Sequence, residues 1–159
     1  MAIKRSEFSA RGGWWVLAQA PIMIIAALVP LFWGARSFDG TNAIQVIGTV
    51  MSALGVLLAI AGVAALGRGL TPFPRPMPQA QLQQGGIYGL VRHPIYSGFI
   101  LASIGWSLVW LSGPGLVFCV LVAIFFDRKS AFEETLLREK FPGYQNYMLR
   151  VRKLLPWIY

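Results

Sequence analysis

Two long runs of uncharged, mostly apolar residues constrain the fold of this chain more than any other feature. They cover residues 14–33 and 43–66, and each is about as long as the twenty residues an α-helix needs to cross the hydrocarbon core of a bilayer. Trp14 and Trp33 stand at the two ends of the first run, where a membrane interface favours tryptophan. This run is too long for the apolar part of a signal peptide and has no small-residue cleavage site after it. We therefore expect both runs to be membrane helices.

Two shorter apolar runs, at residues 95–111 and 116–127, complete a pattern of four predicted spans. A Ser-Gly-Pro-Gly sequence at residues 112–115 signals a turn between them. The last run is short for a full crossing, but its helix can continue past Asp127 into the headgroup layer. Because 56% of the residues are hydrophobic, the composition is that of a membrane protein. The sequence predicts an all-α integral membrane protein with one domain over residues 1–159.

The tail that follows Asp127 is polar, basic and aromatic. Apolar residues recur at helical spacing between Arg128 and Lys140, which predicts an amphipathic helix that continues the fourth span. A Pro-Gly pair at residues 142–143 ends this helix, and a second short helix is expected before Pro156. The basic side chains of this amphipathic helical tail are expected to meet the phosphates of anionic membrane lipids.

The distribution of lysine and arginine predicts how the chain is oriented. Three basic residues lie before the first run, three in the central loop at residues 67–92 and seven in the tail, against one between the first two runs. With four spans these three basic segments share one side, and the positive-inside rule makes that side cytoplasmic. We therefore expect a multi-pass protein with both termini in the cytoplasm. The net charge of +8 then reports contact with anionic lipids, and we expect no nucleic acid partner.

The chain has few side chains that suit a metal site. It contains one histidine, His93, and one cysteine, Cys119, whereas zinc and iron sites usually draw on several such ligands. A single cysteine also rules out an internal disulfide. We expect no protein-built metal site.

The central loop, residues 67–92, is the longest segment without a helical pattern. Four prolines alternate with other residues over positions 72–78, which favours an extended chain, and a loop this long is usually functional or disordered. It ends at Arg92, directly before His93 and Pro94, and proline suits the first turn of a helix. Arg92 and His93 are therefore expected at a helix N-terminus, where backbone N–H groups and the helix dipole favour an anionic ligand group.

Three charged residues on the predicted tail helix are candidates to act with this loop. Glu133 and Glu134 lie about two turns beyond the membrane boundary, where acidic residues are less expected than basic ones. Lys129 lies one turn before Glu133 and shares its face. The plainer alternatives are a glycine turn at a helix end, a solvated acidic face and a simple ion pair between Lys129 and Glu133.

Motifs in the second half of the chain carry a resemblance to a known family. They are Arg92-His93-Pro94-x-Tyr96-x-Gly98, then Glu133-Glu134-x-x-Leu137, then Phe141, Tyr144, Tyr147, Val151 and Pro156. Together they resemble the isoprenylcysteine carboxyl methyltransferase family, which belongs with the membrane phospholipid methyltransferases and uses S-adenosylmethionine. The resemblance covers about residues 80–159, the expected catalytic half, and the first two spans match only as generic apolar helices.

The resemblance implies roles for named residues. Cofactor contacts are implied for Ala80, Gln81, Leu82, Gln83, Tyr88, His93, Pro94, Ile95, Tyr96 and Glu133. The expected catalytic residues are Arg92, Lys129 and Glu134. Lys129 or Arg92 would hold a carboxylate acceptor, whereas an amine acceptor would need Glu134 or His93 as a base.

We therefore expect methyl transfer from S-adenosylmethionine to a lipid-like or isoprenoid-bearing acceptor at the cytosolic face, with a carboxylate as the accepting group. Such a reaction needs no metal and depends on proximity, orientation and the exclusion of water. Phospholipid N-methylation is a second interpretation. A noncatalytic membrane scaffold and a sterol-reductase-like protein with a nicotinamide cofactor are two further alternatives.

Overall fold

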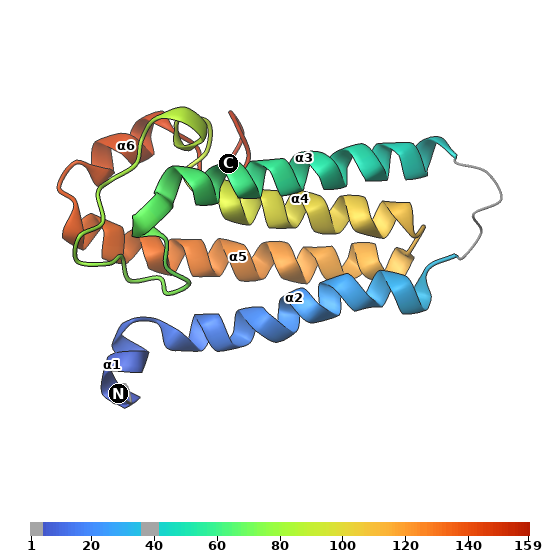
Figure 1. Cartoon of the computed structure of the whole chain (residues 1–159), viewed down its shortest axis with the longest axis horizontal. Helices are drawn as coiled ribbons and strands as arrows, with labels where there is room; N and C mark the ends of the chain where they lie inside the picture. The colour runs from blue at the N-terminus through green and yellow to red at the C-terminus, as the bar shows by residue number, and fades with distance from the viewer. Residues whose placement is uncertain (1–4, 36–41) are drawn as a thin grey trace.

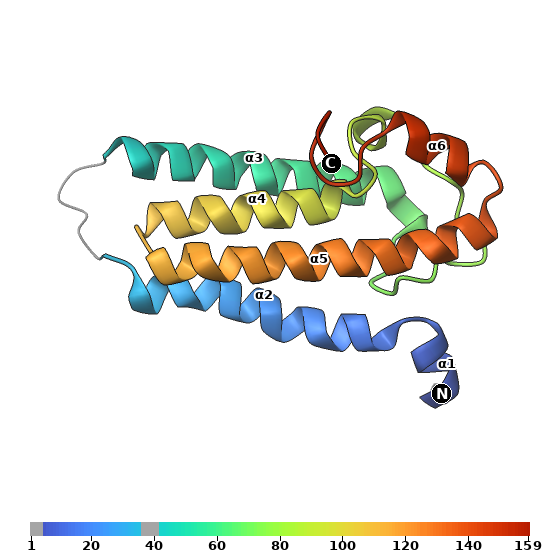
Figure 2. The same cartoon turned by 180° about the vertical axis from the view of Figure 1, so that it is seen from behind.

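The computed structural model of the chain describes residues 5–35 and 42–159. In chain order its elements are α1 (Arg5–Ala10), α2 (Gly13–Trp33), α3 (Ala43–Leu66), the short 3-10 helices η1 (Gly67–Gly69) and η2 (Gly86–Gly89), α4 (Pro94–Val109), α5 (Gly113–Lys140) and α6 (Tyr144–Arg150). Within the described residues these helices are the regular structure and no strand is formed, so the expected all-α class is confirmed. The four long helices lie side by side, and α1, α6 and the long connection between α3 and α4 gather at one end of them (Figure 1, Figure 2).

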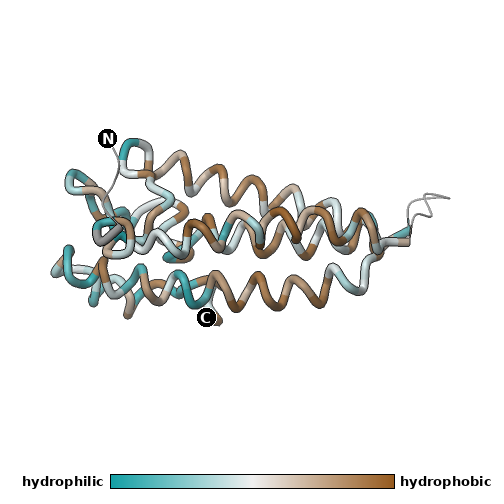
Figure 3. Tube along the Cα trace, turned by 90° about the horizontal axis from the view of Figure 1, so that it is seen from below, coloured by the Kyte–Doolittle hydropathy of each residue, from teal (hydrophilic) through white to brown (hydrophobic). Residues whose placement is uncertain are grey.

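The helices α2 and α3 are the two in the described part of the chain that are long and apolar enough to cross a membrane. α2 continues through two internal prolines, Pro21 and Pro30. Most of the side chains on α2 and α3 are exposed although they are apolar, which distinguishes these helices from the buried core helices of a soluble protein. The hydropathy colouring shows the same division, with apolar helices and a polar end (Figure 3). These features are those of a membrane protein.

The other two long helices differ from the predicted apolar runs in length. α4 begins at Pro94, the expected start, and ends at Val109, shortly before Leu111 adopts a positive φ of 50° that a continuing helix cannot accept. α5 runs unbroken for 28 residues, or about 42 Å at 1.5 Å per residue. It therefore unites the predicted fourth span and the predicted amphipathic helix in one element. The crossing of a membrane by α4 and α5 stays a prediction.

Glycines spaced seven residues apart bring α3 against the backbone of α4. These are Gly48, Gly55 and Gly62. A Cβ atom on Gly55 would lie 2.6 Å from the carbonyl oxygen of Gly98 and 2.5 Å from the backbone nitrogen of Ala102. Small residues thus allow the close approach that membrane helices use. In the order seen in Figure 1, α5 lies beside α4, and α2 packs mainly on α5.

The C-terminal segment after α6 returns to the start of α4. Val91 and Arg152 form a single parallel bridge. The backbone N–H of Arg92 donates to the carbonyl of Arg152 at 2.8 Å, and that of His93 donates to the carbonyl of Lys153 at 3.1 Å. The tail therefore fixes the backbone of the two residues that precede α4.

The tight contact between α3 and α4 predicts the effect of adding one methyl group. Gly55→Ala should lower the melting temperature of the detergent-solubilised protein, because overpacking of a close contact costs about 1–3 kcal/mol. Gly113→Ala is the matched control, since a Cβ atom there meets nothing within 4 Å, and its melting temperature should equal or exceed that of the wild type. Equal melting temperatures for the two variants would show that α3 and α4 can move apart to accept the added methyl group without a loss of stability.

Candidate functional site

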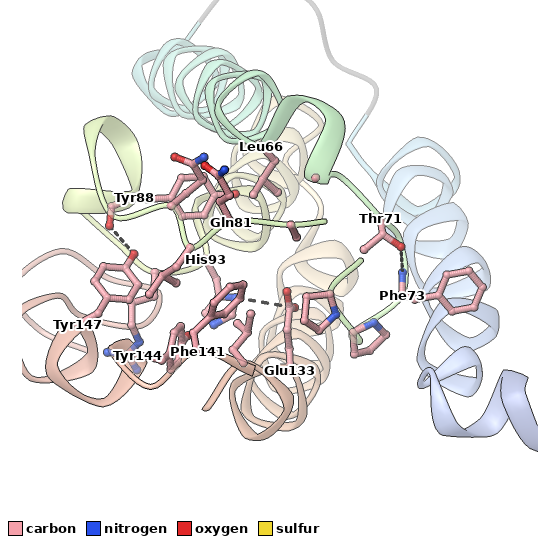
Figure 4. Close-up of a pocket in the computed structure, with 18 residues that line it drawn as sticks. Leu66, Thr71, Phe73, Gln81, Tyr88, His93, Glu133, Phe141, Tyr144 and Tyr147 are labelled. Carbon is pink, nitrogen blue, oxygen red and sulfur yellow. Dashed lines mark hydrogen bonds and ion pairs between the residues drawn. The ribbon is translucent and has the colours of Figure 1, made fainter. Parts of the chain in front are cut away.

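A cavity at the polar end of the helices, called the loop cavity here, lies where the central loop meets α4, α5 and α6. Its volume, open mouth included, is about 620 Å³. Its lining consists of Leu66, Gly69, Thr71, Phe73, Pro74, Pro76, Ala80, Gln81, Leu82, Gln83, Tyr88, Arg92, His93, Glu133, Leu137, Phe141, Tyr144 and Tyr147. Figure 4 shows these side chains around the cavity. Prolines from the loop and aromatic residues from α6 thus enclose a few polar groups.

A second cavity, called the Lys129 cavity here, adjoins the first on the side of the apolar helices. Its volume is about 730 Å³. The residues that it shares with the loop cavity are Leu66, Thr71, Tyr88, His93 and Glu133. The residues that it adds are Gln19, Val63, Leu70, Pro72, Ile95, Tyr96 and Lys129. The two cavities therefore meet at His93 and Glu133.

Most of the residues singled out from the sequence come together around these two cavities. The loop cavity is lined by Ala80, Gln81, Leu82, Gln83, Tyr88, Arg92, His93 and Glu133, and the Lys129 cavity adds Ile95, Tyr96 and Lys129. Two predicted residues line neither cavity. Pro94 is buried at the start of α4 against Gly62, and Glu134 lies buried behind Arg92 and His93. The roles of all these residues stay predictions.

Glu133 faces the point where the two cavities meet. The hydroxyl of Tyr96 donates to its Oε2 at 2.7 Å, and Nδ1 of His93 lies 4.0 Å from the same oxygen. The rings of His93 and Tyr96 are stacked, with centroids 5.4 Å apart. The side chain of Glu133 keeps 24% of its surface exposed, so its carboxylate remains able to accept hydrogen bonds from a ligand.

Glu134, the next residue, points the other way and joins the two residues before α4. Its Oε1 accepts from Nε of Arg92 at 2.8 Å and lies 3.1 Å from Nε2 of His93. Burial raises the pKa of this carboxyl, but the hydrogen bonds and charges of His93 and Arg92 outweigh burial and lower the pKa to about 2. An ionised carboxylate only accepts, so Nε2 of His93 carries the hydrogen and Nδ1 is the atom that faces Glu133.

Arg92 lines the loop cavity, but its guanidinium is engaged within the protein. Besides Glu134 it donates to the backbone carbonyls of Met148 and Val151. Its charge is therefore paired with Glu134 and its donors hold α6 and the tail. Arg92 and Lys129 are the two cations predicted to hold the acceptor, and the charge of Arg92 is already neutralised by Glu134.

Lys129 is the other predicted cation, and only 1% of its surface is exposed. Its ammonium donates to the side-chain oxygen of Gln19 and to the carbonyl of Pro72, and it lies 5.2 Å from the ring centre of Tyr96. Among the described residues no carboxylate lies within ion-pair distance of it, so the plainer alternative of a simple ion pair with Glu133 is not formed. A buried ammonium held by neutral oxygens favours an anionic partner.

Three tyrosines form the wall of the loop cavity on the side of α6. The hydroxyl of Tyr147 donates to the carbonyl of Tyr88 at 2.5 Å (Figure 4), and that of Tyr88 donates to the carbonyl of Gly62 at 3.3 Å. Tyr144 approaches Glu134 with its hydroxyl at 3.5 Å. Burial raises the pKa of each of the three phenols far above 10, with the nearby carboxylates adding to the effect. They therefore stay protonated and act as hydrogen-bond donors.

Sequence reasoning missed two parts of this site. The proline segment lines the loop cavity with Thr71, Phe73, Pro74 and Pro76, and the alternating prolines in a long loop were the available signal. Gln19 holds Lys129 from α2, and the signal was a polar amide inside an apolar run, which inside a membrane usually has a functional reason.

Three side chains in these cavities are available for chemistry: the carboxylate of Glu133, the imidazole of His93 and the ammonium of Lys129. Within residues 5–35 and 42–159 no group of three or more His, Cys, Asp or Glu is placed to hold a metal ion. The carboxylate of Glu133 and the ammonium of Lys129 are one helical turn apart on α5. Glu133 lines both cavities, whereas Lys129 lines the Lys129 cavity alone. This arrangement suits a ligand with a cationic part on one side and an anionic part on the other.

A sequence model described as phospholipid methyltransferase matches residues 43–143, from the start of α3 to the residue before α6. The chain belongs to the phospholipid methyltransferase family. Every predicted site residue lies inside the part that carries the family match. Gln19 and residues 144–159 lie outside the range that this model matches.

Plant relatives within this family are similar over a large part of the chain. The probable protein-S-isoprenylcysteine O-methyltransferase of Oryza sativa subsp. indica is 32% identical over 120 residues, which cover 72% of this chain and 62% of that protein. Protein-S-isoprenylcysteine O-methyltransferase B of Arabidopsis thaliana is 33% identical over 116 residues, which cover 70% of this chain and 58% of that protein. The resemblance stated from the motifs is confirmed, and the match spans about three fifths of the length of these relatives.

A bacterial relative carries a different name. Methanethiol S-methyltransferase 1 of Bradyrhizobium diazoefficiens is 38% identical over 72 residues, which cover 45% of this chain and 25% of that protein. The names of the relatives share the transfer of a methyl group and differ in the group that receives it.

In this family member, the contacts of Glu134 predict a pH-dependent loss of stability. Glu134→Gln should lower the unfolding free energy at pH 7 by about 3 kcal/mol, because it leaves the buried Arg92 without its anion. The folded-state pKa of about 2 lies below the usual 4.5, so this stabilisation is complete above pH 4.5 and is lost as the pH falls towards 2. The melting temperatures of the wild type and of Glu134→Gln should therefore approach each other as the pH falls from 4.5 towards 2.

Glu139→Gln serves as the control for this experiment, because Glu139 is an exposed carboxylate on the same helix. It should melt with the wild type at every pH. A Glu134→Gln variant as stable as the wild type at pH 7 would contradict the structural role given to the Arg92–Glu134 pair.

Proposed function

We propose that this protein is a membrane methyltransferase that uses S-adenosylmethionine to methylate a carboxylate on a lipid-like, isoprenoid-bearing acceptor. The observation that carries the proposal is the position of Lys129, a buried ammonium with neutral partners, in a cavity that meets the loop cavity at Glu133. The names of the plant relatives, which are O-methyltransferases of isoprenylcysteine, support an oxygen atom as the acceptor.

The loop cavity is the proposed cofactor site, and its residues fit the parts of S-adenosylmethionine. Glu133 would hold a hydroxyl or cationic part of the cofactor, and the aromatic and apolar wall formed by Leu137, Phe141 and Tyr144 suits an adenine ring. The backbone at Ala80 to Gln83 and the side chain of Tyr88 would close the cavity around it. When bound there, the cofactor supplies a methyl group from its sulfonium.

The Lys129 cavity is the proposed site of the accepting group. A carboxylate is already nucleophilic at neutral pH, so the protein needs only to hold and orient it, and Lys129 would do this with its charge. In the transfer, the bond from sulfur to methyl breaks and a bond from carboxylate oxygen to methyl forms. The products are a methyl ester and S-adenosylhomocysteine, and no proton has to be removed.

An amine acceptor would need a base, and the contacts of the two candidate bases make that reaction the second choice. Glu134 is ionised but buried behind the cavity and bonded to Arg92 and His93. His93 donates to Glu134 through Nε2, which leaves Nδ1 as the one ring atom able to take a proton. Phospholipid N-methylation is retained as the second candidate function because the description of the family names phospholipids.

The apolar part of the acceptor has room between the helices. A third cavity of about 840 Å³, called the apolar cavity here, is lined by Met23, Ala26, Ala27, Ser52, Val56, Phe99, Ala102, Ser103, Trp106, Val122 and Phe126. Along α2 it begins one turn after Gln19, whose amide contacts Met23, and along α4 it begins one turn after Ile95. An isoprenoid chain could extend from Lys129 into this cavity and remain within the apolar layer.

This assignment requires a membrane topology in which α2, α3, α4 and α5 all cross the bilayer. Both termini and the central loop would then face the cytosol, where the basic residues concentrate. A water-soluble cofactor would reach the loop cavity from the cytosol, and a lipid-like acceptor would reach Lys129 from the bilayer.

Cofactor binding can be measured by calorimetric titration of S-adenosylhomocysteine into the detergent-purified protein. Glu133→Gln should weaken binding at least about tenfold, because hydrogen bonds to a charged group contribute about 1.5–3 kcal/mol. His93→Ala should weaken it as well. Glu139→Gln, an equal change at an exposed site on the same helix, should bind as the wild type does. No saturable binding by the folded wild type would favour the scaffold or the reductase instead.

Turnover tests the role of Lys129 separately. Lys129→Met should keep the affinity for S-adenosylhomocysteine and lower the rate of methyl transfer about 100-fold, because it removes the charge that holds the acceptor. The assay follows labelled methyl groups into N-acetyl-S-farnesylcysteine and, in a parallel reaction, into phosphatidylethanolamine. Labelling of phosphatidylethanolamine alone would show that the acceptor is an amine and would contradict the proposed carboxylate acceptor. Loss of cofactor affinity in Lys129→Met would show that Lys129 belongs to the cofactor site.

A further inference from the structure

A groove on the other side of the α4–α5 pair, called the tail groove here, is not used by the proposed reaction. Its apolar walls include Ile100, Leu101 and Ile104 of α4 and Ala123 and Ile124 of α5. The C-terminal segment covers one side of it with Leu154, Leu155 and Tyr159. Its volume is about 870 Å³, and it shares no lining residue with the loop, Lys129 or apolar cavities. The groove is thus a separate feature of the fold.

One end of the tail groove carries charged side chains, and Arg128 is the most exposed of them. Asp127 lines this end, but its Oδ1 accepts from Lys153 at 2.6 Å and from Tyr159 at 2.8 Å, so Lys153 neutralises it. Arg128 also lines this end, with 75% of its side chain exposed and its Nε 4.0 Å from Asp127. Arg128 is therefore a solvent-exposed cation at the mouth of an apolar groove.

We propose that the tail groove binds an anionic glycerophospholipid of the surrounding membrane, with an acyl chain between α4 and α5 and the phosphate at Arg128. The groove combines the two parts that such a lipid requires, a long apolar slot and a cation at one end. The acyl chain would fill a slot that runs from Ser97 to Ile104, or about 10 Å along α4 at 1.5 Å per residue. The proposal requires that the helices lie in a bilayer, and it does not depend on methyl transfer.

The position of the charged end agrees with the depth of a lipid headgroup. Asp127 and Arg128 come directly after the last apolar run of the sequence, where a membrane boundary is expected. The end of the tail lies nearby, and Trp157 and Ile158 expose 83% and 77% of their surfaces. Exposed tryptophan and isoleucine beside a basic residue are typical of a segment at the membrane interface.

A lipid in this groove would contact the segment of the tail that positions His93 in the candidate functional site. The hydroxyl of Ser97, which lines the groove, lies 2.7 Å from the carbonyl of Leu154 and 3.1 Å from that of His93. Leu154 follows Lys153, whose carbonyl holds the N–H of His93. The same short stretch of tail therefore contacts the lipid on one side and positions His93 on the other.

Lipid binding can be measured by native mass spectrometry of the full chain in detergent, with dioleoylphosphatidylglycerol or dioleoylphosphatidylcholine added in equal amounts. The wild type should retain one phosphatidylglycerol more tightly than phosphatidylcholine. Arg128→Ala should weaken phosphatidylglycerol binding about fivefold, the value of one basic residue near an anionic lipid. Ala123→Phe should abolish retention of both lipids, because the ring would occupy the groove.

Two matched variants control for charge and for bulk. Arg68→Ala removes an exposed arginine that does not line the groove, and Val120→Phe adds a ring on an exposed face of α5 outside it. Both should retain phosphatidylglycerol as the wild type does, and all four variants should bind S-adenosylhomocysteine, which separates this test from that of the proposed function.

The proposal is overturned by equal retention of the two lipids, or by wild-type retention in Ala123→Phe. It is also overturned if light scattering shows a dimer that Ala123→Phe converts to a monomer, since a second copy of the chain would then occupy the groove.

Discussion

The buried carboxylate of Glu134 is the contact on which the rest of the polar end depends. It holds the guanidinium of Arg92 and the ring of His93, and Arg92 in turn holds the carbonyls that close α6 and begin the tail. Charged groups are stable in such a place only when each has its partner. One residue of α5 thereby fixes the end of the loop, the start of α4 and the C-terminal segment relative to one another.

Adjacent glutamates on α5 have opposite environments, and this difference organises the site. Glu134 faces inward and is fully engaged, whereas Glu133 faces the cavities with part of its carboxylate exposed. Lys129 lies one turn earlier and is held by neutral oxygens. A single helix thus presents a structural anion, an available anion and an available cation within six residues. The proposed division between a cofactor side and an acceptor side follows from that order.

Local sequence features predicted the helical class and the start of α4 at Pro94, because hydropathy and proline act over a few positions. The meeting of His93 with Glu133 was anticipated through the family motifs. Pairings between residues far apart in the chain left no such pattern. Gln19 stands out as a polar amide inside an apolar run, but its partner Lys129 is 110 residues away, and the bridge from Val91 to Arg152 is formed by backbone alone, so neither pairing could be predicted from residue types.

In the proposed topology, in which α5 crosses the bilayer, the unbroken length of this helix links the candidate site to the thickness of the bilayer. This helix carries apolar residues from Gly113 to Phe126 and, with no kink or joint between them, Lys129 and Glu133 beyond. A bilayer that is thicker or thinner than the apolar part is matched by tilting or by shifting the helix. In that topology such a movement would change the position of Lys129 relative to the lipid headgroups, so the length of the lipid chains would affect the proposed methyl transfer.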